Sequence, residues 1–409
     1  MAAGLSIYRM VAQLPPGSLL ETAWKDSTFI KREAQADFRA HHPQTIPWLD
    51  KLELRTQTSD FNIKQQQYSL RFSPADPSEI NYRKRMESTD VKLFRQLAAD
   101  ALHDALIRRY RVLAEYYWME KQANLFLEQQ TLHQKKTFYL ESLFQHQLDA
   151  ELKDLIQTYR KKEKLQLEST ALQESKKLIL QKSGLKEVRD SIVWNGFQWI
   201  QPAQIRAMFL IQPVAVPVSS SYAKLIQNNS QLELEAARLR EDKWNVLEFF
   251  QARWRNNPND ELIKEKISLG AGFRIPVPGG KRRDQNLILM EKMQMDHEIA
   301  EYEVQYHLDT HTLRQELESL LDQLERQQQR LNQFKIKFQQ PALLSNPLVK
   351  PQDILLIDET ILDWKEEIIR LEKRLMDKYV EYLGHTRLIS TPPYKNYLDA
   401  TLGQLRINE

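Results

Sequence analysis

Two histidines, His307 and His311, have the spacing most suggestive of a site for chemistry. They lie four positions apart in HLDTH, so on a helix both imidazoles would project from one face and could bind a metal ion with a third ligand. A lone pair at this spacing is more often a solvated or subunit-contact face, so we expect no metal site. The sequence has no cysteine, which excludes disulfides, thiolate nucleophiles and cysteine-bound zinc.

The glycines in LGAGFRIPVPGG do not form a phosphate-binding loop. Such a loop should end at the start of a helix, whereas here a proline-bearing strand continues after Gly272. No Ser-His-Asp set and no pair of carboxylates has a spacing that indicates catalysis. We therefore expect neither an enzyme nor a cofactor.

Composition favours long helices with solvated outer faces. Charged residues make up 28% of the 409 positions and there are 10 glycines. The 58 Lys and Arg against 55 Asp and Glu leave a net charge of +3, too balanced for the basic surface that nucleic acid requires. No apolar stretch approaches the roughly 18 to 20 residues of a membrane helix. Residues 1–17 lack the pattern of a signal peptide, so either a cytosolic protein or a mature N-terminus is compatible with them.

The elements that would position any site follow one order twice. After an N-terminal extension (1–17), the first repeat, 18–184, has a helix that Ser18 is expected to cap, a β-hairpin at 47–73, a long helix at 79–145 and a return helix at 148–182. A Trp- and Pro-rich connector (185–221) leads to the second repeat, 222–388. It has a helix, a hairpin at 245–277, a long helix at 281–340 and a return helix at 351–383, before a C-terminal tail (389–409). The strands are assigned from alternating apolar and polar residues. The helices are assigned from long runs without Gly or Pro in which apolar residues recur at helical spacing.

One strand has an apolar face nine residues long, close to the roughly 9 to 11 residues that cross a bilayer. We expect this face to contact the membrane. We expect the chain to change from strand to long helix at the corner that follows. Four strands per chain are too few to close a barrel, which needs about eight, so copies must associate. A soluble α+β protein that packs this face internally is the alternative. The face comprises Ile267, Leu269, Ala271, Phe273 and Ile275; the corner comprises Pro276, Pro278, Gly279 and Gly280.

Two stretches resemble the TolC-like outer membrane efflux protein family. SLGAGFRIPVPGGKRRDQ is similar to that family's strand, Pro and Gly corner and long helix, and NPLVKPQDILLIDETILDWKEEIIRLEKRLMDKYVEYLGHTRL to its closing hairpin arm. With the repeated order, the resemblance covers roughly 18–388. It implies a mainly α fold with a small antiparallel β part, in which duplicated hairpins and long antiparallel helical hairpins complete a β-barrel and an α-helical barrel as a trimer.

The resemblance also implies a location and partners. The homotrimer would lie in outer-membrane lipid with a periplasmic extension, and would dock through a periplasmic adaptor (membrane fusion protein) on an inner-membrane pump. It would catalyse nothing and would passively conduct substrate for efflux or type I secretion. The competing hypothesis is a soluble or periplasmic coiled-coil scaffold that does not insert in the membrane.

The helix tips depart from the family's pattern. Family members often narrow the tunnel with carboxylates near the second tip, but residues 327–340 contain no acid. They contain Arg330, Lys335 and Lys337, which puts a cation-selective gate in doubt. Asp149 and Glu151 at the first tip are the nearest alternatives, although either is more often an ordinary solvated residue.

Overall fold

A computed structural model describes most of the chain. The described residues are 15–43, 48–58, 66–75, 77–146, 152–182, 197–211, 216, 218–241, 247–255, 266–273, 282–340 and 349–405. The chain divides into two compact units. Unit 1 comprises Met1–Phe29, Ala101–Pro217 and Tyr306–Glu409, and unit 2 comprises Ile30–Asp100 and Val218–Gln305. We describe each by itself.

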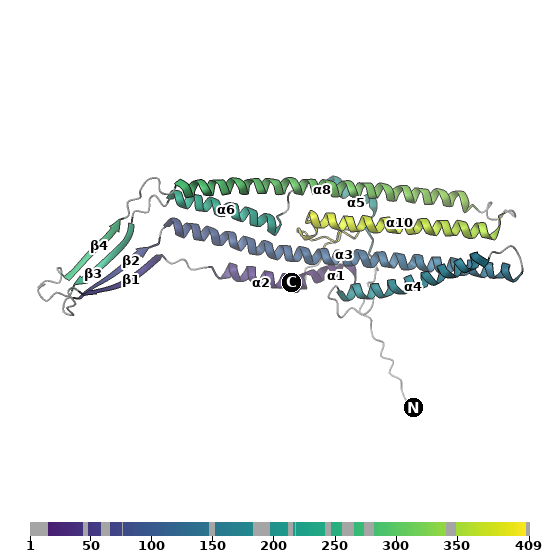
Figure 1. Cartoon of the computed structure of the whole chain (residues 1–409), viewed down its shortest axis with the longest axis horizontal. Helices are drawn as coiled ribbons and strands as arrows, with labels where there is room; N and C mark the ends of the chain where they lie inside the picture. Colours follow the sequence, from purple (N-terminus) through teal and green to yellow (C-terminus); the bar gives the residue numbers. More distant parts are fainter. Residues whose placement is uncertain are drawn as a thin grey trace, which may run out of the picture. The chain divides into compact units, whose positions relative to one another are not determined.

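Unit 2 contains one sheet of four antiparallel strands in the order β1-β2-β3-β4 (Figure 1). The strands are β1 (Leu49–Thr58), β2 (Gln66–Pro74), β3 (Leu247–Arg255) and β4 (Ile267–Phe273). Both expected hairpins are present, and the pairing of β2 with β3 joins them. Residues about 180 positions apart in the sequence thereby become neighbours, such as Tyr68 and Trp254.

Helix α6 (Ser220–Glu241) lies against the N-terminal part of α8 (Arg282–Phe338) in unit 2. Lys292 Nζ is 2.6 Å from a Glu233 carboxylate oxygen, and the Tyr222 and Tyr302 rings stack with centroids 5.2 Å apart. These contacts pair early residues of one helix with late residues of the other, so the two helices run antiparallel. Figure 1 shows them side by side.

The helical core of unit 1 is built from α3 (Pro77–Gln145), α8 and α10 (Pro351–His385). Apolar residues recurring at three- and four-residue spacing place one buried stripe on each helix. Leu106 and Leu113 of α3, Leu317 and Leu324 of α8, and Leu375 and Tyr379 of α10 are all at most 2% exposed. Helix α10 starts at a proline, which suits a first turn because no N–H partner is needed there. The Asp353 carboxylate accepts from the Lys350 backbone N–H at 2.9 Å and caps that turn.

The return helix α4 (Leu152–Lys182) behaves differently. Four of its apolar residues, Leu152, Ile156, Leu167 and Leu178, are at least 45% exposed, whereas Leu155, Leu165, Leu172 and Ile179 are half-buried. Ion pairs also join α4 to its neighbours, among them Lys176 Nζ to Glu120 Oε1 at 3.0 Å.

Three segments differ from the sequence-based expectation. The helix expected from Ser18 onward is three pieces: α1 (Pro16–Glu21), the 3-10 helix η1 (Thr22–Lys25) and α2 (Ser27–His41). A cap at Ser18 was wrong, because Pro16 is tolerated in the first turn of α1. The presumed tail is part of the core: Ile389, Tyr397 and Leu398 are buried, and Leu398 O accepts from Ile200 N at 3.0 Å. The connector also forms α5 (Pro202–Ile211).

The fold class is confirmed: long antiparallel helices accompany a small antiparallel sheet in the duplicated order. The division of the chain into two sequence repeats stays a prediction, because the two compact units each draw on both. No helix in the described ranges carries a long enough apolar stretch to cross a membrane.

Candidate functional site

The four-stranded sheet of unit 2 has one apolar face. Residues directly opposite each other in an antiparallel ladder lie on the same face. The register therefore aligns Leu54, Leu70, Ala252 and Leu269 in one row across the sheet, and Leu52, Phe72, Phe250 and Ala271 in the next. A third row reads Thr56, Tyr68, Trp254 and Ile267. We call these three rows the apolar face.

Much of the apolar face is exposed within one chain. Leu54 is 73% exposed, Leu269 84% and Leu52 63%. Its centre is aromatic: Tyr68 stacks on Trp254, and Phe72 stacks on Phe250 with centroids 5.3 Å apart. Contiguous apolar patches of this kind are rare on monomers in water and mark a contact with a partner or a membrane.

The opposite face of the sheet is polar. It carries Lys51, Glu53, Arg55 and Gln57 of β1; Gln67, Ser69 and Arg71 of β2; Gln251, Arg253 and Arg255 of β3; and Ser268 and Gly270 of β4. Glu53 binds Lys51 and Arg55 on its own strand. Arg71 lies 3.6 Å from Glu248. We call this set the polar face.

A close approach explains how an aromatic residue, Phe249, is accommodated on the polar side. Phe249 pairs with Gly272 across the sheet, beside an irregularity in the register. A Cβ on Gly272 would lie 2.2 Å from the Phe249 ring, so a larger residue there would force the ring to move. The Arg71 guanidinium lies over the same ring, 3.4 Å from its centroid. Gly272 thus lets Phe249 lie flat and supports Arg71. Gly270 has no such role, because nothing lies within 4 Å of its Cβ direction.

The sheet ends in two edges. In the described part of the chain β1 pairs only with β2, and β4 only with β3. An edge strand exposes unpaired N–H and C=O groups and is a template for a further strand. The sheet therefore has the form of a segment that other strands could extend at both sides.

The structure describes only part of the strand that was expected to face the membrane. Ile267, Leu269 and Ala271 lie on the apolar face, and Phe273, 66% exposed, pairs with Leu247 beyond the irregularity. Ile275 and the whole corner, Pro276, Pro278, Gly279 and Gly280, lie outside the described residues. Contact of this strand with lipid stays a prediction.

Sequence reasoning missed the central residues of the apolar face. Phe250, Ala252 and Trp254 alternate with polar neighbours in the sequence, a period-2 signal that identifies one face of a strand. That signal could have extended the face to β3. Its alignment with β2 depends on the register between the two hairpins, which no local pattern encodes.

Three of the expected tip residues lie in the described part of the chain. Arg330 is exposed on α8, and Lys335 and Lys337 lie in its last turn, where cations are favoured by the helix dipole. Lys337 Nζ lies 5.2 Å from the Phe338 ring centroid. Asp149 and Glu151 lie outside the described residues, so a gate at either tip stays a prediction.

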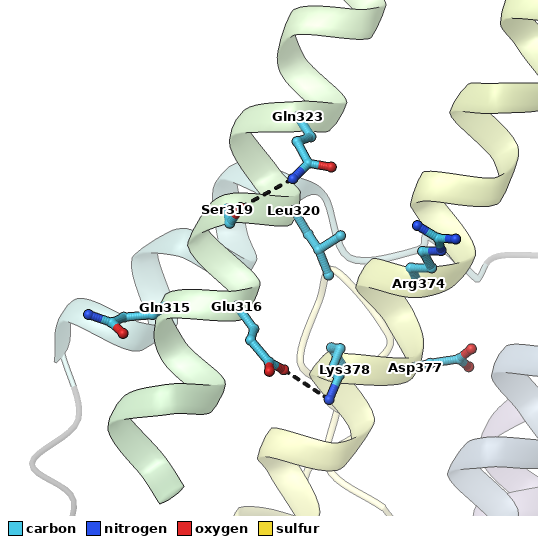
Figure 2. Close-up of a pocket in the computed structure, with 8 residues that line it drawn as sticks. All are labelled: Gln315, Glu316, Ser319, Leu320, Gln323, Arg374, Asp377 and Lys378. Carbon is cyan, nitrogen blue, oxygen red and sulfur yellow. Dashed lines mark hydrogen bonds and ion pairs between the residues drawn. The ribbon is translucent and has the colours of Figure 1, made fainter. Parts of the chain in front are cut away.

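Unit 1 has a shallow groove between α8 and α10, with a volume of about 650 Å³ (Figure 2). Glu316 of α8 and Lys378 of α10 pair across it at 2.9 Å. Hydrogen bonds from Lys378 to Glu316 and to Glu381 raise the pKa of the lysine. Figure 2 shows the Asp377 carboxyl pointing away from this pair. The groove is open to solvent, and the Ser319 hydroxyl in it accepts from the Gln323 amide at 3.2 Å.

A ladder of ion pairs joins α10 to its neighbours in unit 1. Glu359 of α10 lies 2.7 Å from Lys136 of α3 and 2.6 Å from Lys161 of α4. Partial burial raises the pKa of Glu359, but hydrogen bonds and charge from the two lysines outweigh it and lower the pKa to about 2. Lys121 and Glu372 pair at 2.6 Å.

The two histidines lie on the surface of α8. His307 and His311 are exposed on α8, with the His307 ring edge-on to Tyr306 at 5.6 Å. Among the described residues no three His, Cys, Asp or Glu side chains gather to hold a metal ion.

Comparisons with known proteins rest on structure alone. No family model matches the chain, and no curated protein matches it in sequence. The outer membrane protein VceC of Vibrio cholerae is similar in structure, with TM-score 0.59, 11% identity, 91% of this chain and 95% of that chain covered. CusC, studied for its transmembrane channel formation, gives TM-score 0.60 at 11% identity, with 92% of each chain covered. The CmeC outer membrane channel of Campylobacter jejuni gives 0.50 at 11% identity, covering 91% and 85%. The chain therefore has the TolC-like fold of these outer membrane proteins.

Proposed function

We propose that the chain is one subunit of a trimeric, TolC-like outer-membrane channel that passively conducts substrate for efflux or type I secretion. The observation that carries the proposal is a sheet with an exposed apolar face, a polar face behind it and an edge at each side. Outer-membrane barrels have this alternation, with apolar side chains toward lipid and polar side chains toward the lumen.

The number and length of the strands support assembly from three copies. Four strands cannot close around a lumen, whereas three copies supply twelve. Strands β1, β2 and β3 have 10, 9 and 9 residues, near the roughly 9 to 11 that a tilted strand needs to cross the hydrocarbon core. Strand β4 has 7 within the described residues. The sheet would serve as one third of a barrel.

Helix α4 supports association of copies independently of the sheet. Ile156, Leu167 and Leu178 recur every eleven residues and are 45%, 68% and 52% exposed. An eleven-residue period keeps one face of a nearly straight helix in register over its length. We infer that this face packs on the helices of a second copy in the trimer. The adaptor and the inner-membrane pump remain partners by fold-level analogy alone.

Two measurements test the proposal. Native mass spectrometry in detergent should give three chains per particle, and the purified chain should produce stepwise conductance in a planar bilayer. A monomer that fractionates away from membranes would overturn the proposal. That outcome would favour the soluble or periplasmic scaffold, which has no evident use for the exposed apolar face.

A further inference from the structure

The polar face of the sheet carries an excess of arginine. One row of this face contains Arg55, Ser69, Arg253 and Ser268, which are sequence neighbours of the apolar row from Leu54 to Leu269. The next row, closer to the β1–β2 and β3–β4 loops, contains Gln57, Gln67 and Arg255. We call Arg55, Arg253 and Arg255 the arginine band. Ser69 is only 7% exposed although it lies on this face, which is consistent with cover by the longer side chains at either side.

Acidic residues of the strands do not cancel this charge. The four strands contain five cations, Lys51, Arg55, Arg71, Arg253 and Arg255, and three anions, Asp50, Glu53 and Glu248, so five minus three leaves +2 per chain. Asp50 and Glu248 lie at the two register irregularities, at the end of the sheet away from Arg255.

The members of the arginine band differ in their partners. Glu53 accepts from Arg55 Nε at 3.0 Å but is shared with Lys51. Arg253 has a neutral neighbour: the Gln67 amide, in the orientation that satisfies its hydrogen bonds, accepts from Arg253 Nη1 at 3.3 Å. A hydrogen bond to an amide holds the guanidinium in place and leaves its charge intact. Arg55 and Arg253 are therefore positioned as well as positive.

We propose that the arginine band makes the lumen selective for anions, so that the channel's preferred permeants carry net negative charge. The inference rests on the proposed function, which places the polar face toward the lumen. Three copies would set nine arginines, three from each chain, around the bore at adjacent levels. Rings of Arg or Lys select anions in pores, and walls with apolar backing focus such a field.

A second segment has charge of the same sign. Residues 327–340 at the end of α8 carry Arg330, Lys335 and Lys337 and no acid. The polar face of the sheet and this helix end would then both disfavour cations.

The test is ion selectivity of the full chain in a planar bilayer of neutral phosphatidylcholine. Reversal potentials in a tenfold KCl gradient give the permeability of chloride relative to potassium. We expect a ratio above one in about 0.1 M KCl, where charges act over about 10 Å. The ratio should fall toward one near 1 M, where this range is about 3 Å.

Two double variants separate charge from shape. Arg253→Gln with Arg255→Gln lowers the strand charge from +2 to zero, and we expect the chloride-to-potassium ratio to fall by roughly twofold or more. Arg253→Lys with Arg255→Lys keeps the charge and should keep the ratio. Reversal potential does not depend on how many channels insert, so a poorly assembling variant still gives a valid reading from single openings.

The outcomes distinguish the two proposals. Absence of any conductance from trimeric, folded protein would overturn the proposed function, and the inference with it. Conductance that prefers potassium, or a ratio that is unchanged in the glutamine variant, would overturn the arginine band and leave the channel standing.

Discussion

A matched pair of substitutions on neighbouring residues of β4 separates a lipid-facing sheet from a sheet that meets water. Leu269 lies on the apolar face and is 84% exposed, while Ser268 precedes it on the polar face. Leu269→Arg and Ser268→Arg introduce the same side chain one position apart. Only their direction differs.

The two environments give opposite expectations for Leu269→Arg. If the apolar face met water, arginine at so exposed a site would change the free energy of unfolding by at most about 0.5 kcal/mol. If it meets lipid, arginine costs about 2 to 4 kcal/mol per copy near the bilayer midplane, and about three times that for a trimer. Ser268→Arg lies on the polar face and should cost at most about 1 kcal/mol in either environment, from repulsion by Arg253 directly opposite it.

The assay is assembly into vesicles, followed by urea titration of the inserted protein. We expect Leu269→Arg to leave most of the chain outside the vesicles, and Ser268→Arg to insert as the wild type does. Circular dichroism of both variants in detergent checks that the helices are intact. Equal insertion of the two variants, with equal urea midpoints, would refute the reasoning that places the apolar face in lipid.

Three further substitutions test packing and charge. Gly272→Ala should lower the free energy of unfolding by about 1 to 3 kcal/mol, because its Cβ would lie 2.2 Å from the Phe249 ring; Gly270→Ala, with open space around it, is the matched control, and equal urea midpoints for the two would contradict the account. Glu359 has a pKa lowered to about 2 from 4.5, so the stability that it contributes is complete above about pH 4.5 and is lost as the pH falls toward 2. Glu359→Gln should remove that part of the acid dependence, on the order of 1 kcal/mol after solvent screening, and acid unfolding curves that superimpose would refute it. Tyr379→Phe deletes a buried hydroxyl that donates to a backbone carbonyl at 3.1 Å. We expect the free energy of unfolding, measured by thermal unfolding, to fall by about 1 kcal/mol. An unchanged value would show that this hydrogen bond does not contribute to stability.

Local sequence patterns determined the elements and their order. Breaker-free runs with apolar residues every three or four positions specify α3, α8 and α10, because a helical period is a property of neighbouring residues. Alternation specified β4 in the same way. Local patterns gave the wrong start for the first helix. Ser18 is a favourable cap residue, but the helix begins at Pro16, because a proline is tolerated in the first turn.

Only the tertiary structure decided which strands share a face and which helix faces stay uncovered. The pairing of Tyr68 with Trp254 and of Ser69 with Arg253 depends on the register between hairpins far apart in the chain. That register turns separate short strands into one apolar face and one arginine-bearing face. It likewise took the packed structure to show that the tail around Leu398 is core and that Ile156, Leu167 and Leu178 of α4 are exposed. The physical reason is that periodicity determines on which face of its own helix or strand a residue lies. The neighbours of that residue depend on contacts between elements, which are fixed only when the whole chain folds.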